Sequence, residues 1–75
     1  IGFNAIPKKI LNSKIITAND LSQLCSVDKR PDLNQKIYQK HVKDSDHDLE
    51  LVCKKYINDK SIDYAWTIIS ILEER

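Results

Sequence analysis

The sequence has one glycine, no methionine, two cysteines and no long apolar run. Strand-rich folds need glycine at the positive-φ positions of hairpin turns, whereas helices can be joined through Asn, Asp and Ser. The single glycine, Gly2, therefore favours an all-α fold, and it excludes the glycine-rich phosphate-binding loops of nucleotide-binding enzymes. Because no apolar run approaches the ~20 residues of a membrane span, we expect no membrane helix.

The length of 75 residues suits one domain, near the size at which a single core gives only a few kcal/mol of net stability. The chain begins with Ile1 and has no Met, so we expect a single helical domain over residues 1–75 that is part of a longer protein. No charged-then-apolar leader opens it. We expect an intracellular protein, cytoplasmic or nuclear.

The two cysteines, Cys25 and Cys53, form no CxxC pair, which excludes the usual zinc knuckle and redox motifs. Both fall on the apolar face of a predicted helix, where a free Cys acts as a small hydrophobic residue. One bridge would be few for a small secreted scaffold. We therefore expect two buried free thiols and a reducing compartment.

The last stretch, residues 61–75, holds the only Trp and is predicted to be the central helix. Ser61 is a suitable N-cap, and the helix dipole favours Asp63 in the first turn. Its apolar residues recur every three or four positions, over more than a third of the circumference. They are Ile62, Ala65, Trp66, Ile68, Ile69, Ile71 and Leu72.

Two helices are predicted in the first third of the chain. The first has Asn4 as its N-cap and Pro7 in its first turn, and it ends near residues 12–14. The second begins at Ala18, because Thr17 and Asp20 have the spacing of a capping box, and it ends before residues 28–31. Its predicted buried face is Leu21, Leu24 and Cys25.

Two more helices are predicted before the central one. One runs from Pro31 or Asp32 to about Lys43, and the next begins with Ser45 and Asp48 and ends at a turn over residues 58–60. The inner face of the latter is predicted to be Leu49, Val52, Cys53 and Tyr56. The fold class is therefore all-α, a small bundle of about five short helices packed around the C-terminal one.

Metal chemistry has one apparent signal, the alternating carboxylates of residues 44–48, which resemble the start of an EF-hand loop. However, Leu49 occupies the position of the required Gly, and Lys55 occupies that of the bidentate Glu. His41 and His47 lack any zinc spacing and are predicted to lie on the surface. We predict no metal site, no cofactor and no catalytic residue, so the protein is not expected to be an enzyme.

Residues 17–28 look like the first helix and turn of a DNA-binding helix-turn-helix. The second helix would then begin near Asp32, whose carboxylate would face phosphates. Base or phosphate contacts could still come from Arg30, Asn34, Gln35 and Lys36. Two helices that simply pack together are the alternative.

The segment of residues 49–75 resembles a helical hairpin of the pentatricopeptide or tetratricopeptide kind. The resemblance rests on Val52 and Cys53, Tyr56, a polar turn and Ala65, because closely crossing helices need a small residue at their contact. Residues 6–18 weakly echo residues 52–65. The resemblance implies hairpins that bind RNA or proteins through a stacked surface.

A second resemblance starts from residues 10–24 and ends in residues 64–74. In outline this arrangement is similar to caspase recruitment and other death-fold domains. It implies a helical module that pairs with other proteins through charged faces.

The function that we predict is a non-enzymatic helical protein–protein interaction module. Its contacts would use either the basic face of the third predicted helix or the acidic end of the last helix. The candidate residues are Arg30, Lys36, Lys40, Lys43, Asp63, Glu73 and Glu74.

The alternative is a nucleic-acid-binding helical module, although the net charge of only +1 is far from the strongly basic balance of a dedicated nucleic-acid binder. Its candidate contacts are Lys8, Lys9, Arg30, Lys36, Lys40 and Lys43.

Overall fold

The computed structural model describes residues 6–26 and 34–75, and these residues form five helices with no strand among them. The all-α prediction is therefore confirmed. The helices are α1 (Lys8–Leu11), α2 (Ala18–Cys25), α3 (Gln35–His41), α4 (Asp46–Asn58) and α5 (Ile62–Glu73).

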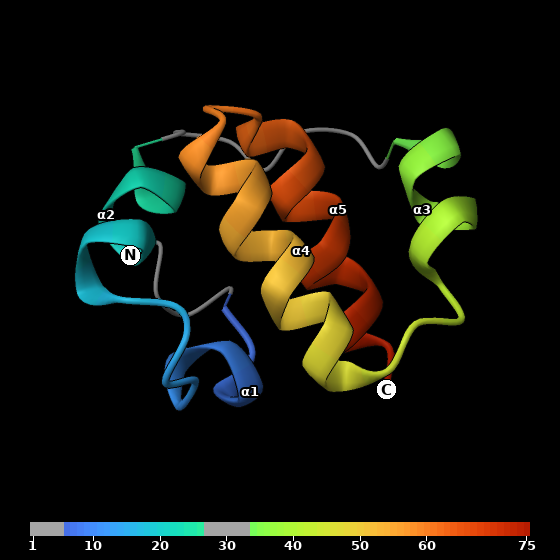
Figure 1. Cartoon of the computed structure of the whole chain (residues 1–75), viewed down its shortest axis with the longest axis horizontal. Helices are drawn as coiled ribbons and strands as arrows, with labels where there is room; N and C mark the ends of the chain where they lie inside the picture. The colour runs from blue at the N-terminus through green and yellow to red at the C-terminus, as the bar shows by residue number, and fades with distance from the viewer. Residues whose placement is uncertain (1–5, 27–33) are drawn as a thin grey trace.

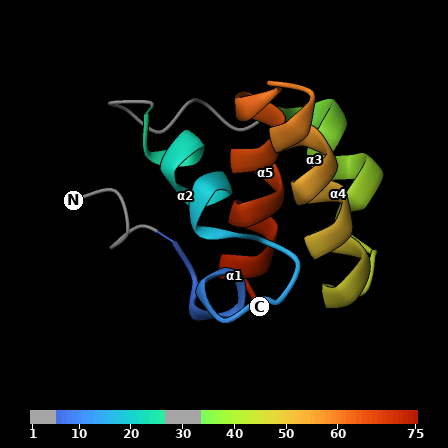
Figure 2. The ribbon, with the colours of Figure 1, turned by 60° about the vertical axis from the view of Figure 1, so that its left-hand side comes forward.

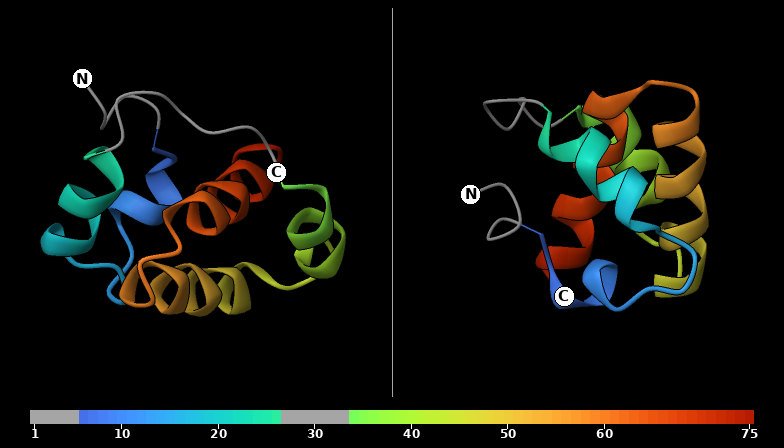
Figure 3. Two further views of the ribbon diagram at one scale, coloured as in Figure 1. Left: turned by 90° about the horizontal axis from the view of Figure 1, so that it is seen from above. Right: turned by 90° about the vertical axis from the view of Figure 1, so that its left-hand side faces the viewer.

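The antiparallel hairpin of α4 and α5 forms the centre of the molecule (Figure 1). Figure 2 brings α1 and α2 to the front of α5, with α3 on the far side of the hairpin. Seen from above, α2 and α3 lie at opposite ends (Figure 3). The hairpin is thus the scaffold on which the other helices are placed.

The central position predicted for the last helix is confirmed. Trp66 is buried, and its indole Nε1 donates a hydrogen bond to the Leu24 carbonyl of α2 at 3.3 Å. The other buried residues of α5 are Ala65, Thr67, Ile68, Ile69, Ile71 and Leu72. They meet buried side chains from the other elements, namely Ile6, Ile10, Ile16, Leu24, Leu49, Cys53 and Ile57.

Local capping explains where α2 and α4 begin. The Thr17 hydroxyl accepts from the Asp20 backbone N–H, and the Asp20 carboxylate accepts from the Thr17 backbone N–H, so the predicted capping box is confirmed. Ser45 caps α4 in a similar way by accepting from the Asp48 N–H. Ser61 is the N-cap of α5 but makes no side-chain cap hydrogen bond.

The turn between α4 and α5 explains the position of Ser61. Its N–H bonds to the Tyr56 carbonyl and the N–H of Lys60 bonds to the Ile57 carbonyl, which is the pattern of a Schellman C-cap. Lys60 has a φ of 64°, in the left-handed region where Gly is usual. Its Nζ donates to Gln23 Oε1 at 2.9 Å and so connects this turn to α2.

The predicted bounds of two helices differ from those in the structure. Helix α1 is a single turn in which Pro7 is the N-cap, not a first-turn residue, while Asn4 lies outside the described residues. Helix α3 begins later than predicted because Asn34 has an extended backbone and caps the helix, accepting from the Ile37 N–H. It ends at His41, before Lys43.

Both thiols are free, as predicted. Cys53 is also buried as predicted, but the prediction of a buried thiol is wrong for Cys25, which is partly exposed. The buried face of α4 differs from the predicted inner face. Ile57 is fully buried, whereas Val52 and Tyr56 are partly buried at the edge of the core.

None of the helices described here is long and apolar enough to cross a membrane.

Candidate interaction surface on α3

Helix α3 packs chiefly against α5 and is fixed to the hairpin by three side-chain contacts. At its N-terminal end the Asn34 N–H donates to Thr67 Oγ1 at 3.2 Å. In its middle the Tyr38 hydroxyl donates to Glu74 Oε2 at 2.7 Å. This bond to a carboxylate, together with partial desolvation, raises the pKa of Tyr38 above its usual value. Both ends of α3 are therefore held, because His41 supplies the third contact.

His41 is buried, with 8% of its surface exposed, so the prediction of a surface histidine is wrong for this residue. Its ring nitrogens lie 2.7 Å from Asp44 Oδ2 and 3.1 Å from the Tyr56 hydroxyl. Tyr56 also makes edge contacts with the rings of His41 and Tyr64. Burial, and then Tyr64, raise the pKa of Tyr56. His47 is exposed, as predicted.

Arg75 fixes the turn that follows α3. Its Nη2 donates to the carbonyls of Val42 and Asp44 at 2.7 and 2.6 Å, and its Nη1 donates to the Asp46 carboxylate at 2.7 Å. Asp46 also accepts from Lys9 at 2.9 Å. Bonds from Lys9 and Arg75 lower the pKa of Asp46. The Asp46 carboxylate therefore joins the start of α4 to α1 and to the end of α5.

Three of the predicted basic residues lie on this fixed helix and in the turn that directly follows it. Lys36 and Lys40 are exposed one helical turn apart, and Lys43 is exposed in the turn beyond His41. We call these three residues the lysine row. Within the described residues, none of them has a hydrogen bond or an ion pair from its side chain. Arg30 lies outside the described residues.

The predicted acidic end does not form one patch. Asp63 lies in the first turn of α5 and Glu73 is its last residue, which places them roughly 15 Å apart along the helix. Glu74 follows as the C-cap and binds Tyr38 of α3. The three acids are exposed, but only Glu73 and Glu74 share one end.

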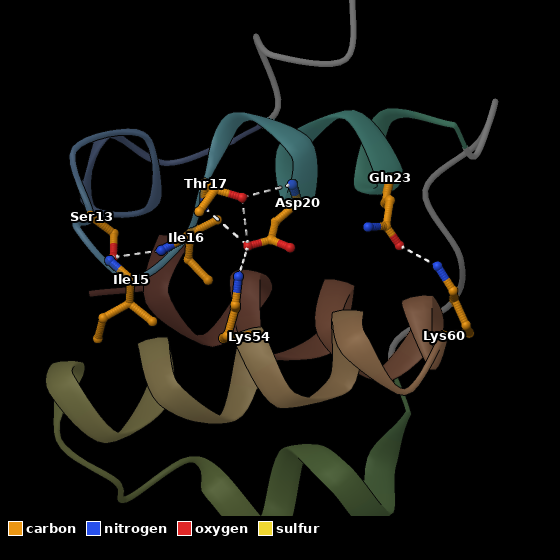
Figure 4. Close-up of polar contacts among 8 residues, drawn as sticks. All are labelled: Ser13, Ile15, Ile16, Thr17, Asp20, Gln23, Lys54 and Lys60. Atoms are coloured by element: carbon orange, nitrogen blue, oxygen red, sulfur yellow. Dashed lines mark hydrogen bonds and ion pairs between the residues drawn. The ribbon is translucent and has the colours of Figure 1, made fainter.

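The structure also contains a partly buried ion pair between α2 and α4 that no spacing in the sequence indicates (Figure 4). Lys54 of α4 points across to α2, where its Nζ binds Oδ2 of Asp20. Asp20 is 2% exposed, and Thr17 donates to the same oxygen from its N–H and its hydroxyl. Burial raises the pKa of Asp20, but the bonds from Lys54 and Thr17 together lower it below its usual value. The pair joins α2 to the hairpin.

The carboxylates of residues 44–48 do not converge. Asp44 faces His41, Asp46 binds Lys9 and Arg75, and Asp48 is exposed. Across residues 6–26 and 34–75, no group of three metal-ligating side chains is arranged to hold an ion. Burial raises the pKa of the Cys53 thiol to about 12, so this thiol is not a nucleophile near neutral pH.

A shallow hollow of about 310 Å³ lies at the turn between α4 and α5. It is lined by five consecutive residues, 60–64, and so is formed by one turn of chain rather than by convergent elements. It brings together no set of groups that would suggest chemistry.

Comparison with protein-family models, with curated proteins and with solved structures found no match. The two resemblances therefore remain predictions about architecture. The α4–α5 hairpin does place Ala65 at the helix contact, where the Cys53 thiol lies 3.9 Å from the Ala65 carbonyl oxygen. The earlier segment does not repeat it, because α1 is one turn long.

The helix-turn-helix interpretation is not supported by the placement of its two helices. That motif packs consecutive helices against each other, so that the second can enter the major groove. Here α2 and α3 lie on opposite sides of the α4–α5 hairpin (Figure 1). The lysines of α3 therefore form a surface that is separate from α2.

Proposed function

We propose that this chain is a non-enzymatic helical module that binds another protein through the lysine row of α3. One observation carries the proposal: two exposed lysines lie one turn apart on a helix that is fixed at both ends, a third follows in the turn directly after it, and no acidic side chain of the described residues pairs with them. A fixed helix loses little conformational freedom when it binds, which favours recognition.

Two groups of the kind that enzymes use as nucleophile or base, those of His41 and Cys53, are already engaged or buried in the described fold. Both ring nitrogens of His41 have partners within 3.1 Å. Cys53 is buried with a raised pKa. These observations support a binding role over a catalytic one.

A protein partner fits the charge pattern better than a nucleic acid does. Three lysines that neutralise three phosphates would give a logarithmic salt dependence of only about −3, whereas dedicated binders make roughly 6 to 10 such contacts. In addition, the carboxylate of Glu74, at the end of α5, accepts a hydrogen bond from Tyr38 of α3. This negative charge close to the lysines would repel a phosphate backbone. Of the other basic candidates, Lys9 already pairs with Asp46.

The proposal can be tested by retention of proteins from a cell extract on the immobilised domain, with and without nuclease. The domain should retain the same proteins after nuclease, and raising the salt concentration should release them. The Lys36→Glu, Lys40→Glu double variant should lose them. The matched Lys14→Glu, Lys55→Glu variant, which changes two exposed lysines elsewhere, should not.

Circular dichroism would show that both variants remain folded. Equal retention by the two variants would refute the role of the lysine row. Recovery of nucleic acid alone, with all proteins lost after nuclease, would support the nucleic-acid-binding alternative instead.

A further inference from the structure

We infer that the lysine row recognises an acidic α-helix of the partner protein, with carboxylates at positions i, i+4 and i+7 on one face. The inference rests on the proposed function and specifies the chemistry of the partner. It follows from the spacing of the row, from the shape of the surface around it and from the charges elsewhere in the chain.

The spacing of the row is that of one helix face. Lys36 and Lys40 are four residues apart on α3, and Lys43 follows three residues later. Helix α3 ends at His41, but its C-cap Val42 keeps helical dihedral angles, with φ −59° and ψ −26°, and its N–H bonds to the Tyr38 carbonyl, so Lys43 follows directly after a helical residue. The row therefore extends roughly 10 Å along the axis. A partner helix with carboxylates at the same intervals has the same rise between charges.

An extended segment is a poorer fit for this surface. Extended peptides bind by adding a strand to a sheet edge, and the described part of the chain contains no strand. Proline-rich segments need a groove lined by aromatic side chains, whereas Tyr38, the aromatic residue of α3, is occupied with Glu74. A helix satisfies its own backbone and offers only side chains, as α3 does.

A second copy of this chain does not supply the acidic face in its described residues. Asp46 and Glu50 are four apart on α4, but the Asp46 carboxylate already binds Lys9 and Arg75. Asp63 and Glu73 lie at opposite ends of α5. The described residues therefore favour a different protein as the partner.

The surface beside the row is polar. Gln35 and Gln39 are exposed on α3, whereas the large apolar side chains that are exposed in the described structure, such as Leu51, lie on other helices. Apolar burial thus contributes little to this contact, and the charge spacing provides its specificity. Such a complex is expected to be weak and sensitive to salt.

The test uses two synthetic alanine-rich helical peptides of equal composition and charge. One carries Glu at i, i+4 and i+7, and in its isomer the three Glu residues point to three different sides. Each is titrated into the isotopically labelled chain while the backbone amide signals are followed by NMR. We expect shifts confined to α3 and its following turn, and binding of the aligned peptide at least about fivefold tighter than that of the isomer.

The matched variants give the control. Lys36→Gln, Lys40→Gln, Lys43→Gln should abolish the preference for the aligned peptide. Lys8→Gln, Lys14→Gln, Lys55→Gln removes three exposed lysines elsewhere and should retain it. Both sets lie on the surface, and unchanged amide spectra would show that the fold survives.

The outcomes separate this inference from the proposed function. Equal binding of the two peptides, or tighter binding of a single-stranded oligonucleotide, would overturn the acidic-helix inference. Binding of neither peptide would also overturn it, and the proposed function would stand only if retention of proteins from extract still depended on the row. Loss of that dependence would overturn both.

Discussion

Asp20 satisfies one carboxylate oxygen with three donors from two parts of the chain. Two of the donors belong to Thr17 in the capping box, and the third is the ammonium of Lys54 on α4. A buried carboxylate is costly without such partners. Asp20 therefore fixes the start of α2 and its attachment to the hairpin at once.

The Asp20→Asn substitution is predicted to destabilise the fold by about 1.5 to 3 kcal/mol at neutral pH, because the charged bond to Lys54 is lost. The folded-state pKa of Asp20 lies below the ordinary value of 3.8. A lowered pKa means that the ionised form stabilises the fold above the unfolded-state pKa, and that this stabilisation is lost as the pH falls through the folded-state pKa. The difference between the two proteins should therefore shrink below about pH 4. Chemical denaturation across pH measures it.

Asp48→Asn is the matched control, because Asp48 occupies the same third position in α4 but is exposed. Its loss should cost less than about 1 kcal/mol, the size of a helix-dipole effect. If both substitutions had the same effect, the Asp20–Lys54 pair would contribute nothing beyond helix capping.

The polar residues show which contacts a sequence can predict. The capping box of Thr17 and Asp20 is local, and its spacing is visible in the chain. Lys54 reaches Asp20 only because α2 crosses α4, so no spacing indicates the pair. His41 is similar: its partner Tyr56 belongs to the next helix, and its burial depends on how α3 is seated.

Among the elements, α5 was the most predictable, because its wide apolar stripe requires burial on more than one side. Its residue Trp66 both fills the core and bonds to Leu24, which joins it to α2. The short helices were less predictable. The boundaries of α1 and α3 depend on the caps Pro7 and Asn34, which compete with equally plausible starts nearby.

The Trp66→Ala substitution is predicted to cost about 3 to 5 kcal/mol, because it removes a large buried side chain and leaves a cavity between α2 and α5. This is enough to unfold a domain of this size. The measurement is thermal unfolding followed by far-ultraviolet circular dichroism. A folded Trp66→Ala variant of normal stability would show that α5 is not the centre of the core.

Trp66→Phe separates the two contributions of this side chain. It keeps an aromatic ring in the core but removes the indole N–H, so the Leu24 carbonyl loses its bond. The cost should be smaller, about 1 to 3 kcal/mol. Equal effects of the two substitutions would mean that the hydrogen bond, not the packing, dominates.

At the scale of the whole molecule, stability is expected to be uneven. Helices α4 and α5 bury their faces against several neighbours, whereas α3 packs chiefly against α5 and depends on side-chain contacts at its two ends. Elements with few buried contacts open locally at a smaller free energy than the global one. The lysine row therefore lies on a helix whose position depends on a few side-chain contacts to the hairpin.

Arg75 connects the turn after α3 to the open end of the hairpin, where α4 begins and α5 ends. Arg75→Ala is predicted to raise the hydrogen-exchange rate of the Val42 and Asp44 amides several-fold, because it releases two carbonyls of the turn after α3. Amides of α2 should be unchanged. Native-state exchange measured by NMR tests this.

Arg75→Lys provides the matched comparison. Lysine keeps the charge opposite Asp46 but cannot bind two carbonyls and a carboxylate with one planar group. If Arg75 acts through charge alone, Lys should restore the slow exchange. If Arg75 acts by holding the carbonyls of Val42 and Asp44, Lys should restore the slow exchange only in part. In that case both variants should also weaken the alignment of Lys43 with Lys36 and Lys40. Unchanged exchange in Arg75→Ala would show that His41 and Tyr56 suffice to fix the end of α3.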